Sequence, residues 1–124
     1  MGPGLKRILA TVSLAALLGQ SVTVVAAQEL DAEMDFRLWC ALALLQLGAR
    51  DAFPSEDEAT AARAAAEVHS DIVSGAVAGM NSDRFDELLA SYQDEVFMQL
   101  DDYQAHGDAE ALRFSLDSCV ATGV

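Results

Sequence analysis

Apolar residues recur at intervals of three and four along the chain beyond residue 30, which is the period of one face of an α-helix. Alanine is abundant, only 2 residues are proline, and no segment alternates as a half-buried strand does. Gly48, Asn81 and Gly107 interrupt the apolar stripes. The sequence therefore predicts an all-α fold with four helices, over residues 31–47, 56–80, 83–106 and 108–120.

The composition of these segments indicates how they pack. The first is the richest in leucine and contains Trp39 and Cys40, so we expect it to be the central element of the core. Ser55 and Glu58 have the spacing of a capping box at the start of the second helix. Short connections favour antiparallel neighbours, so we expect a small up-down four-helix bundle.

The first 27 residues have the three parts of a secretory signal peptide. Lys6 and Arg7 form a basic start, an apolar run follows, and the small residues Val25-Ala26-Ala27 form a cleavage site. The apolar run is interrupted after about a dozen residues, whereas a membrane span needs about 20. We therefore expect cleavage after Ala27, one mature domain over residues 28–124, a periplasmic or secreted location, and no stable membrane insertion.

Cys40 and Cys119 are the only 2 cysteines of the chain, and they lie near the two ends of the expected domain. Two widely separated thiols in an exported protein indicate a disulfide. In an up-down bundle the start of the first helix lies near the end of the last, which places the two cysteines at similar heights. We therefore expect one Cys40–Cys119 disulfide that closes the bundle.

The 20 acidic residues far outnumber the seven basic ones, and the net charge is −13. Such a surface repels nucleic acid and anionic lipid headgroups, so neither is expected as a partner. It favours a basic protein or a cation. Phe97 borders the apolar stripe of the third helix and Met98 falls outside it, and we expect an exposed patch at these two residues or on the alanine-rich second helix.

Two further groups of residues are candidates for chemistry. His69 falls on the apolar face of the second helix, where it is either a hydrogen-bonded core residue or a pH switch. Acidic residues and one histidine gather at one pole of the expected bundle and form a candidate weak cation site: Glu56, Asp57, Glu58, Asp101, Asp102 and His106. No EF-hand loop accompanies them, and acids at helix starts are ordinary partners of the helix dipole.

The chain contains no nucleophile elbow, zinc-protease motif, phosphate-binding loop or haem-attachment motif, so we expect no enzyme activity and no cofactor. The leading hypothesis is an exported interaction or structural protein of the bacterial-type cell envelope, with an unidentified protein partner. An acid-activated periplasmic chaperone is the first alternative, because neutralised carboxylates and a charged His69 would loosen the packing. A weak binder of divalent cations is the second alternative.

Overall fold

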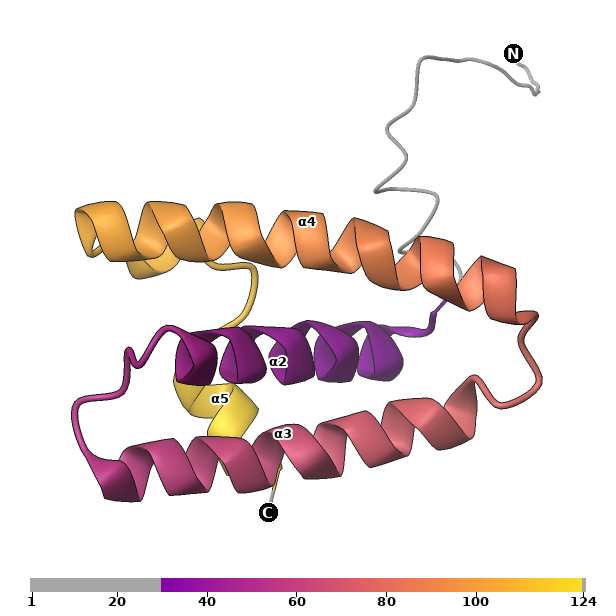
Figure 1. Ribbon diagram of the computed structural model, residues 1–124, viewed down its shortest axis with the longest axis horizontal. Coiled ribbons are helices and arrows are strands. Elements are labelled where there is room, and N and C mark those ends of the chain that lie inside the picture. Colours follow the sequence, from indigo (N-terminus) through magenta and orange to yellow (C-terminus); the bar gives the residue numbers. More distant parts are fainter. Residues whose placement is uncertain (1–29, 124) are drawn as a thin grey trace, which may run out of the picture.

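The computed structural model describes residues 30–123 (Figure 1). The expected signal peptide and its cleavage site lie outside these residues. The described chain is all-helical and contains no strand. It forms α2 (Ala32–Ala49), α3 (Glu56–Ala76) and α4 (Ser82–His106), followed by the 3-10 turn η1 (Ala109–Ala111) and the short helix α5 (Leu116–Ala121). None of these helices is both long and apolar enough to cross a membrane.

Each of the three long helices begins at a side chain that caps its free N–H groups. Asp31 accepts a hydrogen bond from the N–H of Met34 at 2.8 Å, and Ser55 accepts one from Glu58 at 3.1 Å. Asn81 accepts a hydrogen bond from the N–H of Arg84 at 3.1 Å. At the other end of α4, Gly107 has a φ of 66°, the left-handed conformation that glycine adopts without strain.

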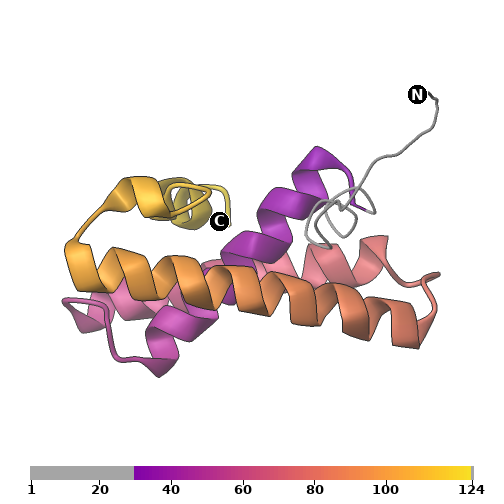
Figure 2. The same cartoon turned by 90° about the horizontal axis from the view of Figure 1, so that it is seen from above.

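The helix α2 is the central element, with α3 on one side and α4 on the other (Figure 1). Viewed from above, α2 crosses α4 obliquely (Figure 2). The helix α5 packs against α2 and α3. The main core cluster joins all the helices and consists of Trp39, Cys40, Ala43, Leu44, Leu47, Ala62, Ala65, Ala66, Val96, Leu100, Leu112 and Cys119. A second cluster near the α3–α4 turn contains Leu38, Val73, Leu88 and Tyr92.

Alanine on α3 lets the end of the chain approach this helix closely. A Cβ atom at Gly123 would lie only 2.5 Å from the Cβ of Ala65, so only glycine fits there. The alanine-rich stripe of α3 therefore serves as the surface on which α5 and the residues after it pack.

The fourth helix expected over residues 108–120 is not continuous. The η1 turn, an extended residue at Leu112 and the six-residue α5 take its place. The reason is tertiary: the N–H of Arg113 donates to Oε1 of Gln99 on α4 at 3.0 Å instead of extending a helix. Ser115 then caps α5 by accepting from the N–H of Ser118. The described chain thus has three long helices and one short helix, and no fourth long helix.

The helix α2 extends past Gly48, the expected stop, and ends in a Schellman motif. The N–H of Ala52 donates to the carbonyl of Leu47 at 3.0 Å, and the N–H of Asp51 donates to Gly48 at 3.1 Å. This geometry puts Asp51 in the left-handed region, with a φ of 55°. The side chain of Asp51 makes this conformation costly, although aspartate tolerates it better than most residues do.

Replacing Asp51 with glycine should therefore stabilise the protein. We expect Asp51→Gly to raise the free energy of unfolding by about 0.5 kcal/mol, because relief of the left-handed strain exceeds the added freedom of the unfolded chain. Asp51→Ala should lower it by about 1 kcal/mol. Urea unfolding of the three proteins measures both changes, and an Asp51→Gly variant less stable than the alanine variant would contradict the assignment.

Candidate functional site

The two cysteines form a buried joint between α2 and α5. The Sγ atoms of Cys40 and Cys119 lie at disulfide-bond distance, with the Cα atoms 5.3 Å apart, and both residues are fully buried. The expectation of a Cys40–Cys119 pair is confirmed. Because neither sulfur reaches solvent, this pair has the features of a structural bridge rather than of an exposed redox centre.

His69 is the buried polar residue at the meeting point of α2, α3 and α5, and its side chain is fully enclosed. Its Nε2 atom lies 2.7 Å from the carbonyl oxygen of Cys119, and its Nδ1 atom lies 3.1 Å from Nη1 of Arg37. A carbonyl oxygen only accepts hydrogen bonds, so Nε2 carries the hydrogen and Nδ1 accepts from the guanidinium. A neutral imidazole thus satisfies both partners. The Nε atom of Arg37 also donates to a carboxylate oxygen of Glu33, at 3.0 Å.

The residues of the candidate cation site are not brought together as ligands. All six are exposed, with Glu56, Asp57 and Glu58 in the first turn of α3 and the other three at the end of α4. Asp101 forms an ion pair with Arg50 at 2.9 Å, and Asp102 lies 3.7 Å from His106 on the same helix. Among residues 30–123, no three acidic, histidine or cysteine side chains form a group that could hold a metal ion. The acids of this pole therefore line a surface instead of forming a coordination shell.

A partly buried cluster of polar side chains joins α2, α4 and the segment before α5. Arg113 pairs with Asp35 of α2 and with Glu95 of α4, the latter at 3.0 Å. Gln99 accepts a 3.1 Å bond from the indole N–H of Trp39 and donates to Glu95 at 3.0 Å. This cluster was not predicted from the sequence. A possible signal was the spacing of Glu95 and Gln99, four residues apart beside the buried stripe of α4.

Tyr92 completes the cluster by donating its hydroxyl hydrogen to Asp35. Burial raises the pKa of Tyr92 strongly, and the hydrogen bond to Asp35 raises it further. Burial by itself would lower the pKa of Arg113, but the hydrogen bonds and charges of Glu95 and Asp35 outweigh it, so that pKa is raised. Two carboxylates already neutralise the Arg113 guanidinium, so it is a poor site for an anionic ligand. The cluster therefore holds the segment before α5 against α2 and α4.

The shift at Tyr92 predicts a loss of stability in alkali. A tyrosine in the unfolded chain ionises near pH 10, whereas folded Tyr92 keeps its proton, so the free energy of unfolding falls as the pH rises above about 10. We expect Tyr92→Phe to flatten this fall while lowering stability at pH 7 by about 1 kcal/mol through the lost hydrogen bond. Urea unfolding at pH 7 and pH 11 measures both effects. Tyr103→Phe is the matched control, and an equal flattening in it would contradict the assignment to Tyr92.

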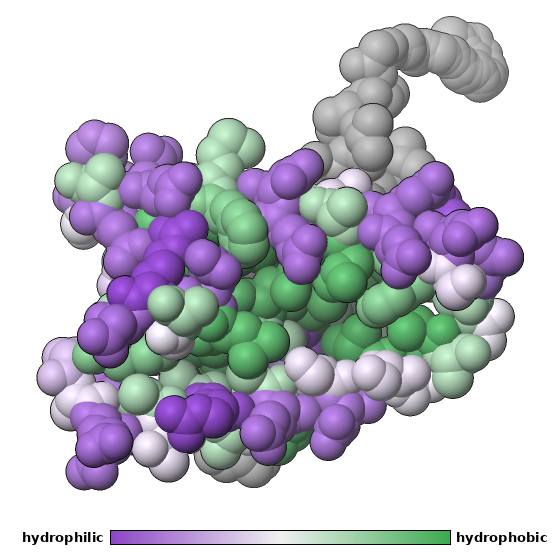
Figure 3. All heavy atoms as spheres, in the orientation of Figure 1, coloured by the Kyte–Doolittle hydropathy of each residue, from purple (hydrophilic) through white to green (hydrophobic). Residues whose placement is uncertain are grey.

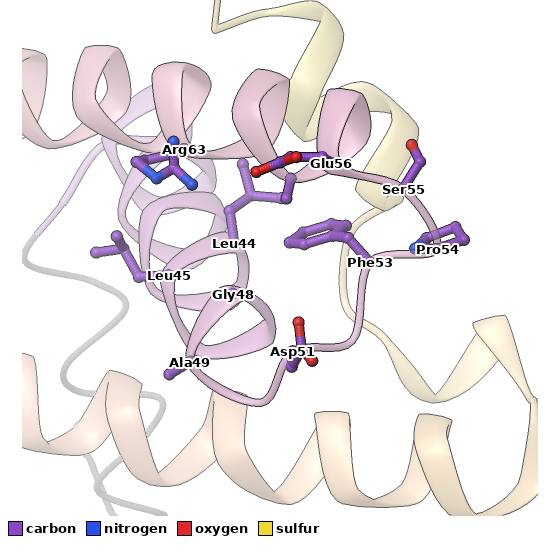
Figure 4. Close-up of a pocket in the computed structure, with 11 residues that line it drawn as sticks. Leu44, Leu45, Gly48, Ala49, Asp51, Phe53, Pro54, Ser55, Glu56 and Arg63 are labelled. Carbon is purple, nitrogen blue, oxygen red and sulfur yellow. The ribbon is translucent and has the colours of Figure 1, made fainter.

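Two clefts flank the loop between α2 and α3. The first, which we call the loop cleft, has a volume of about 590 Å³. In Figure 4 the ring of Phe53 faces Leu44, while Glu56 and Arg63 extend from α3 over the same hollow. The second, which we call the pole cleft, shares Phe53 with the first and lies between this loop, α5 and the end of α4. Its volume is about 850 Å³, within the range of ligand sites in proteins.

The lining of the pole cleft is mainly apolar. Leu44 and Leu47 are its buried floor, and partly buried side chains from three parts of the chain form its walls: Ala52, Phe53, Tyr103, Leu116 and Val120. Its polar residues include the carboxylates Glu58 and Asp117, and no arginine, lysine or histidine lines it. The acidic pole anticipated from the sequence therefore borders an apolar cleft, to which it contributes Glu58.

Other apolar side chains are exposed outside the pole cleft. In Figure 3, hydrophobic residues gather in a hollow over α2, between hydrophilic residues along α4 and α3. Leu45 of α2 is 49% exposed. Phe97 is 38% exposed and Met98 68% exposed, and the guanidinium of Arg50 lies 6.0 Å from the Phe97 ring. Met98 thus projects freely, while Phe97 is partly covered by Arg50.

Comparison of the chain with protein-family models, with curated proteins and with solved structures found no match.

Proposed function

We propose that the chain is an exported, non-enzymatic helical protein that binds a protein partner in a cell envelope of the bacterial type. The basic and apolar segments before Ala27 support export, because they have the layout of a cleavable signal. The observation that carries the binding role is the pole cleft, where partly buried apolar walls lie beside carboxylates and no cation. Apolar surface with a polar rim is the usual anatomy of a protein–protein contact.

The test is site-specific photo-crosslinking in intact cells. A photoreactive residue at Ala61, which is exposed and lines the pole cleft, should capture one discrete envelope protein. The same residue at Ala90, exposed on α4 and outside both clefts, is the control. Equal background capture at both positions would refute a binding role for this pole.

N-terminal sequencing tests export. The sequence of the exported form should begin at Gln28, and a stable full-length form in the cytosol would refute export.

The acid-activated chaperone is a second candidate because of the contacts of His69. Protonation of its Nδ1 would remove the acceptor of Arg37 and place a second positive charge beside that guanidinium. The other polar groups at this contact are the carbonyl of Cys119 on α5, which His69 bonds, and the carboxylate of Glu33 on α2, which pairs with Arg37. Acid would therefore weaken the joint of α2, α3 and α5, and loosened packing exposes apolar helix faces.

The discriminating variant is His69→Gln, whose amide can donate to Cys119 and accept from Arg37 without titrating. Under this proposal wild-type protein binds a hydrophobic dye and suppresses client aggregation at about pH 2–3, where carboxylates are neutral. The variant should need a lower pH to bind the dye. Identical acid profiles for the two proteins would exclude His69 as the switch, and an inactive, dye-free wild type at pH 2 would exclude the chaperone role.

A further inference from the structure

The lining of the pole cleft includes carboxylates but no lysine, arginine or histidine. Four arginines, Arg37, Arg50, Arg84 and Arg113, each form an ion pair with a carboxylate. Glu58 and Asp117 form no ion pair with any described residue, as is also true of other exposed acids such as Asp86 and Asp94, but these two lie beside apolar cleft walls. Each lies in the first turn of its helix, where the positive end of the helix dipole favours a carboxylate. The dipole supplies only a partial charge, so neither carboxylate is fully neutralised.

The apolar walls of the cleft are also uncovered on the side that faces the cleft. Phe53, Tyr103, Leu116 and Val120 pack with one side against the core and line the cleft with the other. These walls come from the loop before α3, from α4 and from α5. The disulfide of Cys119 fixes α5 to α2, so one wall is held covalently in place. A preformed apolar surface of this kind reduces the ordering cost of binding.

We propose that the pole cleft binds a segment of the protein partner in which apolar side chains stand next to lysine or arginine. This inference rests on the proposed function and specifies the chemistry of the partner. The apolar side chains lie against Phe53 and Val120, and the cation lies beside Glu58 and Asp117. Opposite charge at the rim also accelerates association, in a manner that salt suppresses.

A second copy of this chain fits the cleft less well than a basic partner does. Two copies repel each other, because each carries a net charge of −13. No lysine occurs after Lys6, and four of the five arginines beyond Arg7 are already paired within the chain. The partner is therefore expected to supply the positive charge that this chain lacks.

The test measures the binding of short fluorescent peptides to the full mature protein by anisotropy. One peptide combines leucine with lysine, a second combines serine with lysine, and a third combines leucine with glutamate. The leucine–lysine peptide should bind about tenfold more tightly than either of the others, which corresponds to about 1.4 kcal/mol. Equal binding of the serine–lysine peptide would overturn the role of the apolar walls, and equal binding of the leucine–glutamate peptide would overturn the role of the carboxylates.

Variants assign the binding to the cleft. Ala61→Arg places a long cation at its exposed edge and should abolish binding, whereas Ala90→Arg makes the same charge change on α4 and should not. Glu58→Gln with Asp117→Asn should weaken binding about fivefold at low salt, as expected for two exposed charge pairs. The control with equal charge is Asp86→Asn with Asp94→Asn. Equal losses in the two double variants would mean that only the overall charge attracts the peptide, which overturns the proposal.

The crosslinking experiment separates this proposal from the broader function. If Ala61 captures a partner in cells while no leucine–lysine peptide binds, the chemistry assigned to the segment is wrong and the binding role stands. If the peptide binds at the cleft while Ala61 captures nothing, the recognition chemistry stands and the envelope role fails. Size-exclusion chromatography with light scattering adds a further arm, because a dimer disrupted by Ala61→Arg would identify a second copy as the occupant and overturn the proposal.

Discussion

Removal of the Cys40–Cys119 disulfide is expected to lower the free energy of unfolding by about 4.5 kcal/mol in the chain-entropy model. The bridge closes a loop with a sequence separation of 79 residues, and long loops gain the most from closure. A domain of this size has a total stability of about 5–10 kcal/mol, so about half of it or more depends on one covalent bond. Urea unfolding of the oxidised protein and of the Cys40→Ala, Cys119→Ala double variant measures the loss.

The structure also predicts which part of the molecule loosens first. The helix α5 has six residues, too few to be stable alone, and the disulfide is its covalent attachment to α2. Its release would take the carbonyl of Cys119 away from buried His69. Amide hydrogen exchange should therefore increase in residues 116–121 before it increases in α2.

Reduced wild-type protein is the control for the double variant, because it keeps both sulfur atoms and loses only the bond. The two should agree to within about 1 kcal/mol, the difference being the small cavity left by the sulfurs. An unchanged unfolding midpoint after complete reduction, verified by thiol alkylation, would show that the bridge does not limit stability.

Local patterns in the sequence were sufficient to predict the long helices and the pairing of the two cysteines. Period and caps depend on neighbouring residues, so Ser55 and Asn81 mark helix starts without any knowledge of the fold. The burial of His69 follows from its place on the apolar stripe of α3. Its partners, Arg37 and the carbonyl of Cys119, lie 32 and 50 residues away and were not foreseeable from the stripe.

The elements that were not predicted from the sequence depend on contacts between distant residues. The residues around Arg113 have helical spacing, and the helix is interrupted there because Gln99 and Glu95 bind Arg113 from another helix. The pole cleft arises in the same way, since Phe53, Tyr103 and Val120 come from separate segments. Tertiary context commonly overrides helix propensity in this manner.

The ion cluster around Arg113 should be the second major determinant of stability. Arg113→Ala is expected to lower the free energy of unfolding by about 3 kcal/mol, because it leaves two enclosed carboxylates without a cation. The side chains of Asp35 and Glu95 are only 14% and 13% exposed. Chemical denaturation measures the loss, and Glu87→Ala is the control. Glu87 pairs with Arg84 at an exposed site, so its removal should cost about 0.5 kcal/mol or less.

Neutralising the carboxylates distinguishes a charge effect from lost packing. Asp35→Asn keeps an oxygen that can accept from Tyr92, and Glu95→Gln keeps one that can accept from Gln99. Combined with Arg113→Ala, these two changes should restore at least half of the lost stability, because no buried charge remains unpaired. A triple variant as unstable as Arg113→Ala would show instead that the arginine acts through its contacts with Phe114, whose ring centre lies 5.2 Å from the guanidinium.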